Sequence, residues 1–219
     1  QGTSEGNFFV RLSEITSDEK NNLINSIGSA LEAKITVLDF FTVSPLIATE
    51  TLRNAILAVV IATLGMLIYI SWAFRKMPNP FKWGACAVLA LLHDVLIVVG
   101  IFSIMGWLFG TEVDSLFVTG VLAVLGVSVN NIVVVFDRIR DNVNRGISKD
   151  FATTVNIGIV ESVGRSTNTS LCALFTIVAL YLFGGATIHN LVLALLIGII
   201  AGIYSSLCIA GQLLVVWEK

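Results

Sequence analysis

The chain has 219 residues, of which 56% are hydrophobic and only 13% are charged, and its formal net charge is -2. Soluble domains usually hold about 25% charged residues, so half that share together with long apolar runs predicts an integral membrane protein. The small net charge excludes the usual electrostatic signature of a nucleic-acid-binding protein.

The first 50 residues differ from all that follow. Asn7–Leu12 and Lys34–Val43 have the β-branched and aromatic composition of strands, and Thr16 with Glu19 forms a capping box that begins a helix between them. We predict a β-α-β fragment of an extracytoplasmic domain, too short to bury a core by itself. No signal-peptide pattern precedes it, so another segment must place it relative to the membrane.

From residue 51 to residue 219 we predict a transmembrane domain of five helices. Each segment is close to or above the ~20 residues needed to cross the hydrocarbon core. The segments are Leu52–Phe74, Gly84–Leu108, Leu116–Phe136, Ser166–Phe183 and Ile188–Trp217, with a cytoplasmic amphipathic segment at 137–165.

The basic residues predict the orientation. They gather after the first segment, between the third and fourth segments, and after the fifth, whereas the loops 110–115 and 184–190 contain no lysine or arginine. Short basic loops stay in the cytoplasm, so the N-terminal domain is expected outside and the C-terminus inside. The tryptophans lie near segment ends, where interface anchors are expected: Trp72, Trp83, Trp107 and Trp217.

Polar residues inside the membrane are costly and need a reason. Asp94 lies ten residues into its segment, roughly 15 Å deep, with His93 before it. A proton or ion relay and an ordinary interhelical hydrogen bond both explain Asp94. Asn131 lies about 9 Å inside Asp137, with Ser128 on the same helix face.

Arg165 begins the fourth segment. It is either a snorkelling cytoplasmic arginine or a permanent charge that pairs with a carboxylate on a neighbouring helix. The last segment repeats small residues every fourth position, including Gly198, Gly202 and Ser206, which favours close helix packing or a sliding surface. The charged piece after the third segment balances its arginines with aspartates, which favours an intramolecular clamp over lipid targeting.

No catalytic pattern is present in the sequence: HExxH, GxSxG and GxxxxGK[ST] are all missing. The three cysteines, Cys86, Cys172 and Cys208, lie in apolar segments and are interpreted as buried side chains rather than metal or disulfide ligands. We therefore expect no enzymatic activity, metal or cofactor.

Several motifs follow one another along the chain: Val43-Ser44-Pro45, Ile68-Tyr69-Ile70, Leu92-His93-Asp94-Val95, Gly126 to Asn131, Phe136-Asp137-Arg138-Ile139-Arg140, Arg165-Ser166, Thr169-Ser170, Phe183-Gly184-Gly185 and Gly198 to Ser206. With these motifs in this order, the chain resembles the SecF side of the SecD/SecF family of protein-export membrane proteins, in the RND-type superfamily. The resemblance covers essentially the whole chain from about Asn7.

The resemblance implies six membrane helices with a ferredoxin-like extracytoplasmic domain between the first and second, so the five predicted here would be helices two to six. It also implies an inner-membrane accessory subunit that works with SecD and the SecYEG translocon on a translocating polypeptide, using the proton motive force. The implied relay region is Asn131, Arg165, Asp94, His93, Ser128 and Thr169, with Asp137, Arg138 and Arg140 as a cytoplasmic motif.

One residue departs from the family pattern. The pattern usually has an aspartate at the position of Asn131, as a proton-relay member paired with the arginine matched by Arg165. With asparagine there, proton movement would rely on the aspartate of SecD, on Asp94, or be absent. A scaffold that only holds membrane complexes together and an RND-like exporter are the two alternative functions.

Overall fold

The computed structural model describes residues 17–31, 45–111 and 113–218, and the chain divides into two compact units at residues 54 and 55. In the first unit, the expected helix is present as α1 (Ser17–Leu31). The two predicted strands, Asn7–Leu12 and Lys34–Val43, lie outside the described residues. The ferredoxin-like domain therefore stays a prediction.

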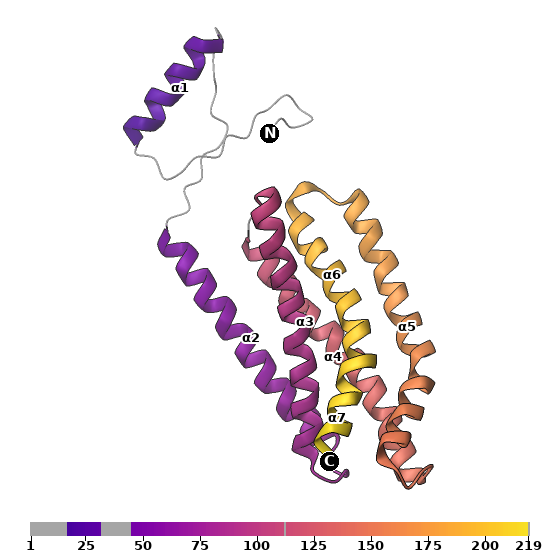
Figure 1. Cartoon of the computed structure of the whole chain (residues 1–219). Coiled ribbons are helices and arrows are strands. Elements are labelled where there is room, and N and C mark those ends of the chain that lie inside the picture. Colours follow the sequence, from indigo (N-terminus) through magenta and orange to yellow (C-terminus); the bar gives the residue numbers. More distant parts are fainter. Residues whose placement is uncertain (1–16, 32–44, 112, 219) are drawn as a thin grey trace. The chain divides into compact units, whose positions relative to one another are not determined.

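The second unit is a bundle of long helices that run alternately up and down (Figure 1). The elements are α2 (Pro45–Ala73), α3 (Pro80–Phe109), α4 (Ser115–Arg145), α5 (Phe151–Phe183), the 3-10 turn η1 (Ala186–Ile188), α6 (His189–Ser205), the π-helical turn η2 (Ser206–Ala210) and α7 (Gly211–Glu218). Among the described residues, 5 helices are long and apolar enough to cross a membrane, α6 to α7 counting as one. The expected membrane all-α architecture is confirmed.

The segment 137–165 is not a separate amphipathic element. Helix α4 continues to Arg145, α5 already begins at Phe151, and only five residues, 146–150, join them. Gly146 ends α4 with φ 64, and Asp150 begins α5 by accepting a hydrogen bond from the Thr153 backbone N–H at 2.9 Å. The bonds from the Thr153 hydroxyl and N–H lower the pKa of the Asp150 carboxyl. Hydropathy marks where the apolar stretch ends, whereas a helix continues for as long as its backbone bonds and caps allow.

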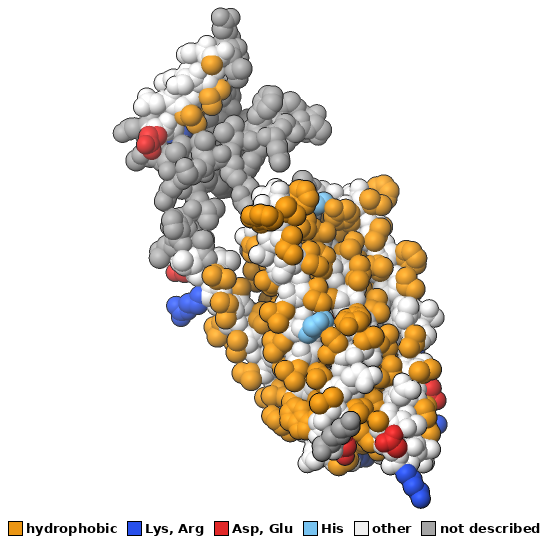
Figure 2. All heavy atoms as spheres, viewed as in Figure 1, with side chains coloured by type: hydrophobic (Ala, Val, Ile, Leu, Met, Phe, Trp, Pro, Cys, Tyr) orange, Lys and Arg blue, Asp and Glu red, His pale blue; other side chains and the backbone are white. Residues whose placement is uncertain are grey.

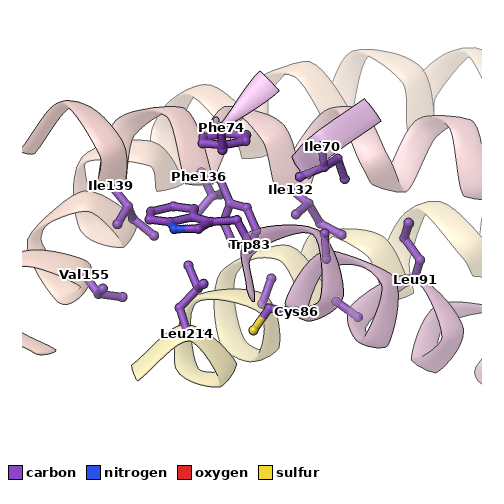
Figure 3. Packing of buried hydrophobic residues seen from close by; sticks show 14 of the residues in the cluster. Ile70, Phe74, Trp83, Cys86, Leu91, Ile132, Phe136, Ile139, Val155 and Leu214 are labelled. Carbon is purple, nitrogen blue, oxygen red and sulfur yellow. The ribbon is translucent and has the colours of Figure 1, made fainter. Parts of the chain in front are cut away.

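Aromatic rings form the part of the core that lies between the end of α2, the start of α3 and α4 (Figure 3). Trp83 is 2% exposed, stacks on Phe74 with ring centroids 5.2 Å apart, and meets Phe136 edge-on at 5.4 Å. Its expected place at the lipid interface is therefore wrong, because its ring fills the space between α2, α3 and α4. Trp72, the preceding tryptophan in the chain, is exposed.

Hydrophobic side chains cover most of the face in Figure 2, and charged side chains gather at the end of the bundle near the C-terminus. We call this end the basic end and define it by Arg75, Lys76, Lys82, Arg138, Arg140, Arg145 and Lys149. Lys82 of α3 is 6% exposed there, and it forms an ion pair with Glu218 of α7. This pair ties the last helix to the start of α3.

Candidate functional site

The most deeply buried acid in the described bundle is Asp94 of α3, whose side chain has no exposed surface. The Ser205 hydroxyl of α6 donates a hydrogen bond to Asp94 Oδ2 at 2.9 Å. His93 Nδ1 lies 3.4 Å from Oδ1, at the outer limit of a hydrogen bond. The Ser128 hydroxyl of α4 also faces this carboxyl, although its geometry falls short of a hydrogen bond. Three helices thus surround one carboxyl group with polar neighbours, as a buried acid requires.

Small residues on α6 let its backbone pack closely enough for the polar groups around Asp94 to come together. A Cβ atom added at Gly202 would lie 2.5 Å from Ser128 Oγ, and one added at Gly198 would lie 2.1 Å from Val124 Cγ2. Only glycine lets the α6 backbone come so near to α4, and this approach carries Ser205 to Asp94. Ser206, the third residue of the small-residue series, is buried and begins η2. Such π-helical turns occur frequently at functional sites.

A second polar contact lies between α4 and α5. Asn131 is 2% exposed, and its Oδ1 accepts a hydrogen bond from the Ser170 hydroxyl at 3.3 Å. Asn131 Nδ2 is buried and has no acceptor among the described residues, and the same holds for the buried hydroxyl of Ser166. A buried amide N–H without a partner is unusual and points to a missing acceptor. A carboxylate at this position would have no such N–H, so the local environment suits an acid as well as an amide.

Arg165 and Thr169, which were expected to face the core beside Asn131, lie on the exposed face of α5. The inner face of this helix is taken by Ser162, Ser166 and Ser170, all buried and spaced by four residues. Adjacent helical residues point about 100° apart, so the residue before each of these serines turns outward. The Thr169 hydroxyl donates to the Arg165 backbone oxygen at 3.0 Å instead of to a side chain.

The motif of Asp137, Arg138 and Arg140, which was expected on the cytoplasmic side, makes ion pairs. Arg138 Nε lies 2.8 Å from Glu161 Oε2, and the Asn142 amide donates to the same oxygen at 2.8 Å. Arg140 pairs with Asp137 on its own helix. These contacts join α4 to α5 at the basic end, so Arg138 links the two helices there through its side chain.

The comparisons with known proteins identify the family. Residues 23–219 match the family model described as "Protein export membrane protein SecD/SecF, C-terminal". The chain belongs to the SecD/SecF family. It is 48% identical to the protein translocase subunit SecF of Thermobaculum terrenum over 100% of this chain and 69% of that protein. It is 44% identical to the SecF subunit of Anaerolinea thermophila over 100% of this chain and 72% of that protein.

Solved structures of the family have the same fold. The crystal structure of SecDF from Thermus thermophilus, a translocon-associated membrane protein, matches 95% of this chain with a TM-score of 0.80 and 34% identity. The chain spans only 27% of that SecDF chain. Another SecDF crystal structure, in the super-membrane-facing form, matches 94% of this chain with a TM-score of 0.74.

Sequence reasoning missed two members of the SecD/SecF bundle that matter for the site. Ser205, the donor to Asp94, is separated from it by 111 positions and stands beside the small-residue series that was recognised. Glu161, the partner of Arg138, lies in a stretch interpreted as an interfacial segment. No pattern in the sequence singled out Glu161, which lies on the exposed face of α5.

Proposed function

We propose that this chain forms the SecF part of an accessory unit of the Sec protein translocase. It works with SecD and the SecYEG translocon, and it uses the proton motive force to assist export of polypeptides across the bacterial cytoplasmic membrane. In this assignment the basic end faces the cytoplasm, since short basic loops stay there. The observation that carries the proposal is family membership over nearly the whole chain. No enzymatic step is proposed.

The exposed Arg165 supports a partner subunit. Within the described ranges no acidic side chain forms an ion pair with it, and it lies in a helix counted among the candidate membrane spans. A charge facing lipid costs at least about 2.5 kcal/mol on insertion scales, so a protein surface should cover this face. We assign that surface to SecD, whose intramembrane aspartate would supply the carboxylate for Arg165.

Co-purification is the first test of this assignment. The chain, tagged and expressed in its native membrane, is expected to retain SecD and SecY through detergent extraction. Recovery of unrelated membrane complexes without SecD would instead favour the scaffold function, for which the non-titrating Asn131 is the specific argument. A self-contained small-molecule export activity without either partner would favour the RND-like exporter.

Replacing Arg165 with leucine is expected to lower gradient-dependent secretion several-fold, because the carboxylate of the partner loses its permanent counter-charge. Arg165→Lys should keep part of the activity, since the charge remains. The matched control is Arg145→Leu, an arginine at the basic end whose partner is Asp141 at 2.8 Å. If Arg165→Leu secretes normally while SecD still co-purifies, the relay role of Arg165 is disproved.

Replacing Asn131 with aspartate tests whether the asparagine limits proton coupling. The new carboxyl would lie against Ser170, whose hydroxyl it can still accept, and it would have no N–H that lacks an acceptor. We expect proton uptake into proteoliposomes containing the complex to rise relative to the wild type. The control is Asn130→Asp, the same change on the exposed face one residue earlier. Equal proton uptake by Asn131→Asp and the wild type would contradict a relay at this position.

A further inference from the structure

A cavity of about 330 Å³ opens at the basic end, where the chain leaves α2 and passes α4. It is lined by Trp72, Ala73, Arg75, Lys76, Arg140 and Asn144, and we call it the basic crevice. Its walls carry three cationic side chains and one amide but no carboxylate. Because two separate helices contribute to it, the crevice is more than a run of basic residues in one loop.

Two of the three cations that line the basic crevice have no acidic partner among the described residues. Across the described part of the chain, Arg75 and Lys76 form no ion pair, whereas Arg138 and Lys82 pair with Glu161 and Glu218. The Arg75 guanidinium lies over the Trp72 ring, 5.2 Å from its centroid, which limits its freedom without neutralising it. Two cations without an acidic partner beside an open cavity favour the binding of an anion in that cavity.

Arg140 completes the set from the opposite wall. Its guanidinium lies over the Phe74 ring, 5.5 Å from the centroid, and Asp137 on the same helix contacts Nη2. A guanidinium has five N–H donors, so one acidic neighbour leaves donors free for a ligand. Arginine forks suit phosphate oxygens, and a lysine adds a point charge.

The position of the crevice identifies the source of the anion. Trp72 is 61% exposed and ends an apolar membrane span, the depth at which tryptophan meets lipid headgroups. From there an exposed apolar stripe runs back along α2 at helical spacing. It consists of Leu57, Ile61, Leu64, Ile68 and Trp72. A cationic crevice at the end of an apolar stripe is complementary to one phospholipid molecule. The phosphate would lie in the crevice and an acyl chain would lie along α2.

We propose that the basic crevice binds the phosphate of an anionic phospholipid from the leaflet at the basic end, held by Arg75, Lys76 and Arg140 with Asn144 as a further donor. None of the residues that line this site belongs to the implied relay region. An anionic headgroup is preferred over a zwitterionic one because the crevice holds positive charge that no choline group should approach.

Native mass spectrometry of the full chain in a neutral detergent tests the proposal, with dioleoyl-phosphatidylglycerol and dioleoyl-phosphatidylcholine as probes. We expect phosphatidylglycerol to bind the wild type more tightly, and the double variant Arg75→Gln/Lys76→Gln to lose about tenfold in that affinity. The matched control Lys149→Gln removes an exposed basic residue outside the crevice and should bind as the wild type does. An equal loss in Lys149→Gln would mean general surface attraction and overturn the site.

Two further measurements keep the result decisive. Asn144→Asp adds a negative charge to the crevice without removing a cation, and it should also weaken phosphatidylglycerol binding. Circular dichroism verifies that each variant keeps the helix content of the wild type. Unchanged binding in both Asn144→Asp and the double variant would overturn the proposal. Displacement of the lipid by inorganic phosphate at ~10 mM would identify a free-phosphate site and overturn the lipid assignment.

Discussion

Replacing Asp94 with asparagine is expected to abolish the gradient-dependent part of secretion and to leave the bundle folded. The carboxyl is fully buried and accepts the hydrogen bond from Ser205 at 2.9 Å. The asparagine carbonyl has the same shape and accepts the same bond, but it neither gains nor loses a proton. Export of a reporter polypeptide into inverted vesicles, with the gradient present and collapsed, measures the effect.

Asp94→Leu separates the structural part of this role from the chemical part. It removes the short hydrogen bond that Ser205 donates to Asp94 and leaves the buried hydroxyl only the Gly202 backbone oxygen at 3.4 Å, so we expect a loss of about 1 kcal/mol of stability. Asp150→Asn is the control, because asparagine caps a helix as well as aspartate does. If Asp94→Asn exports as well as the wild type in the presence of the gradient, Asp94 is a structural residue. If Asp94→Asn lowers the free energy of unfolding as much as Asp94→Leu does, Asp94 is likewise a structural residue.

Replacing Gly198 with leucine is expected to lower the free energy of unfolding by about 3 kcal/mol, at the upper end of typical overpacking effects. Even its Cβ would lie 2.1 Å from Val124 Cγ2 and 2.5 Å from Cγ1, so α6 must move away from α4. The movement would also draw Ser205, two turns further along α6, away from Asp94. Unfolding in mixed micelles with increasing SDS measures the stability.

The matched control for this experiment is Gly100→Leu on α3, where an added Cβ meets nothing within 4 Å. It should leave stability within about 0.5 kcal/mol of the wild type. A cycle of Gly198→Ala, Val124→Ala and the double variant tests the named contact, since trimming Val124 makes room for the new methyl. We expect a coupling of about 1 kcal/mol in favour of the double variant. Additive effects would show that the strain lies elsewhere.

The sequence by itself determined the class of the protein and most of its helices. A membrane span requires about 20 apolar residues in one run, so composition along the chain was enough to find the 5 spans present among the described residues. Helix ends were less predictable. The apolar run before the basic loop stops at Phe136, yet α4 continues to Arg145, because backbone bonds and the Gly146 end decide where a helix stops. The motifs around Asp94 and Asn131 were enough to indicate the family.

Only the tertiary structure decided which polar residues meet. Asp94 and Ser205 stand 111 positions apart, and their contact depends on how closely two glycines let α6 approach α4. Only the structure shows that Arg165 lies on the exposed face of α5, because periodicity defines a set of faces but not which one packs inward. Trp83, near a segment end like Trp72, was buried by the ring of Phe74 in the turn after α2 and by the ring of Phe136 in α4. Side-chain partners across helices follow from packing at short distance, and no local pattern of residues contains that information.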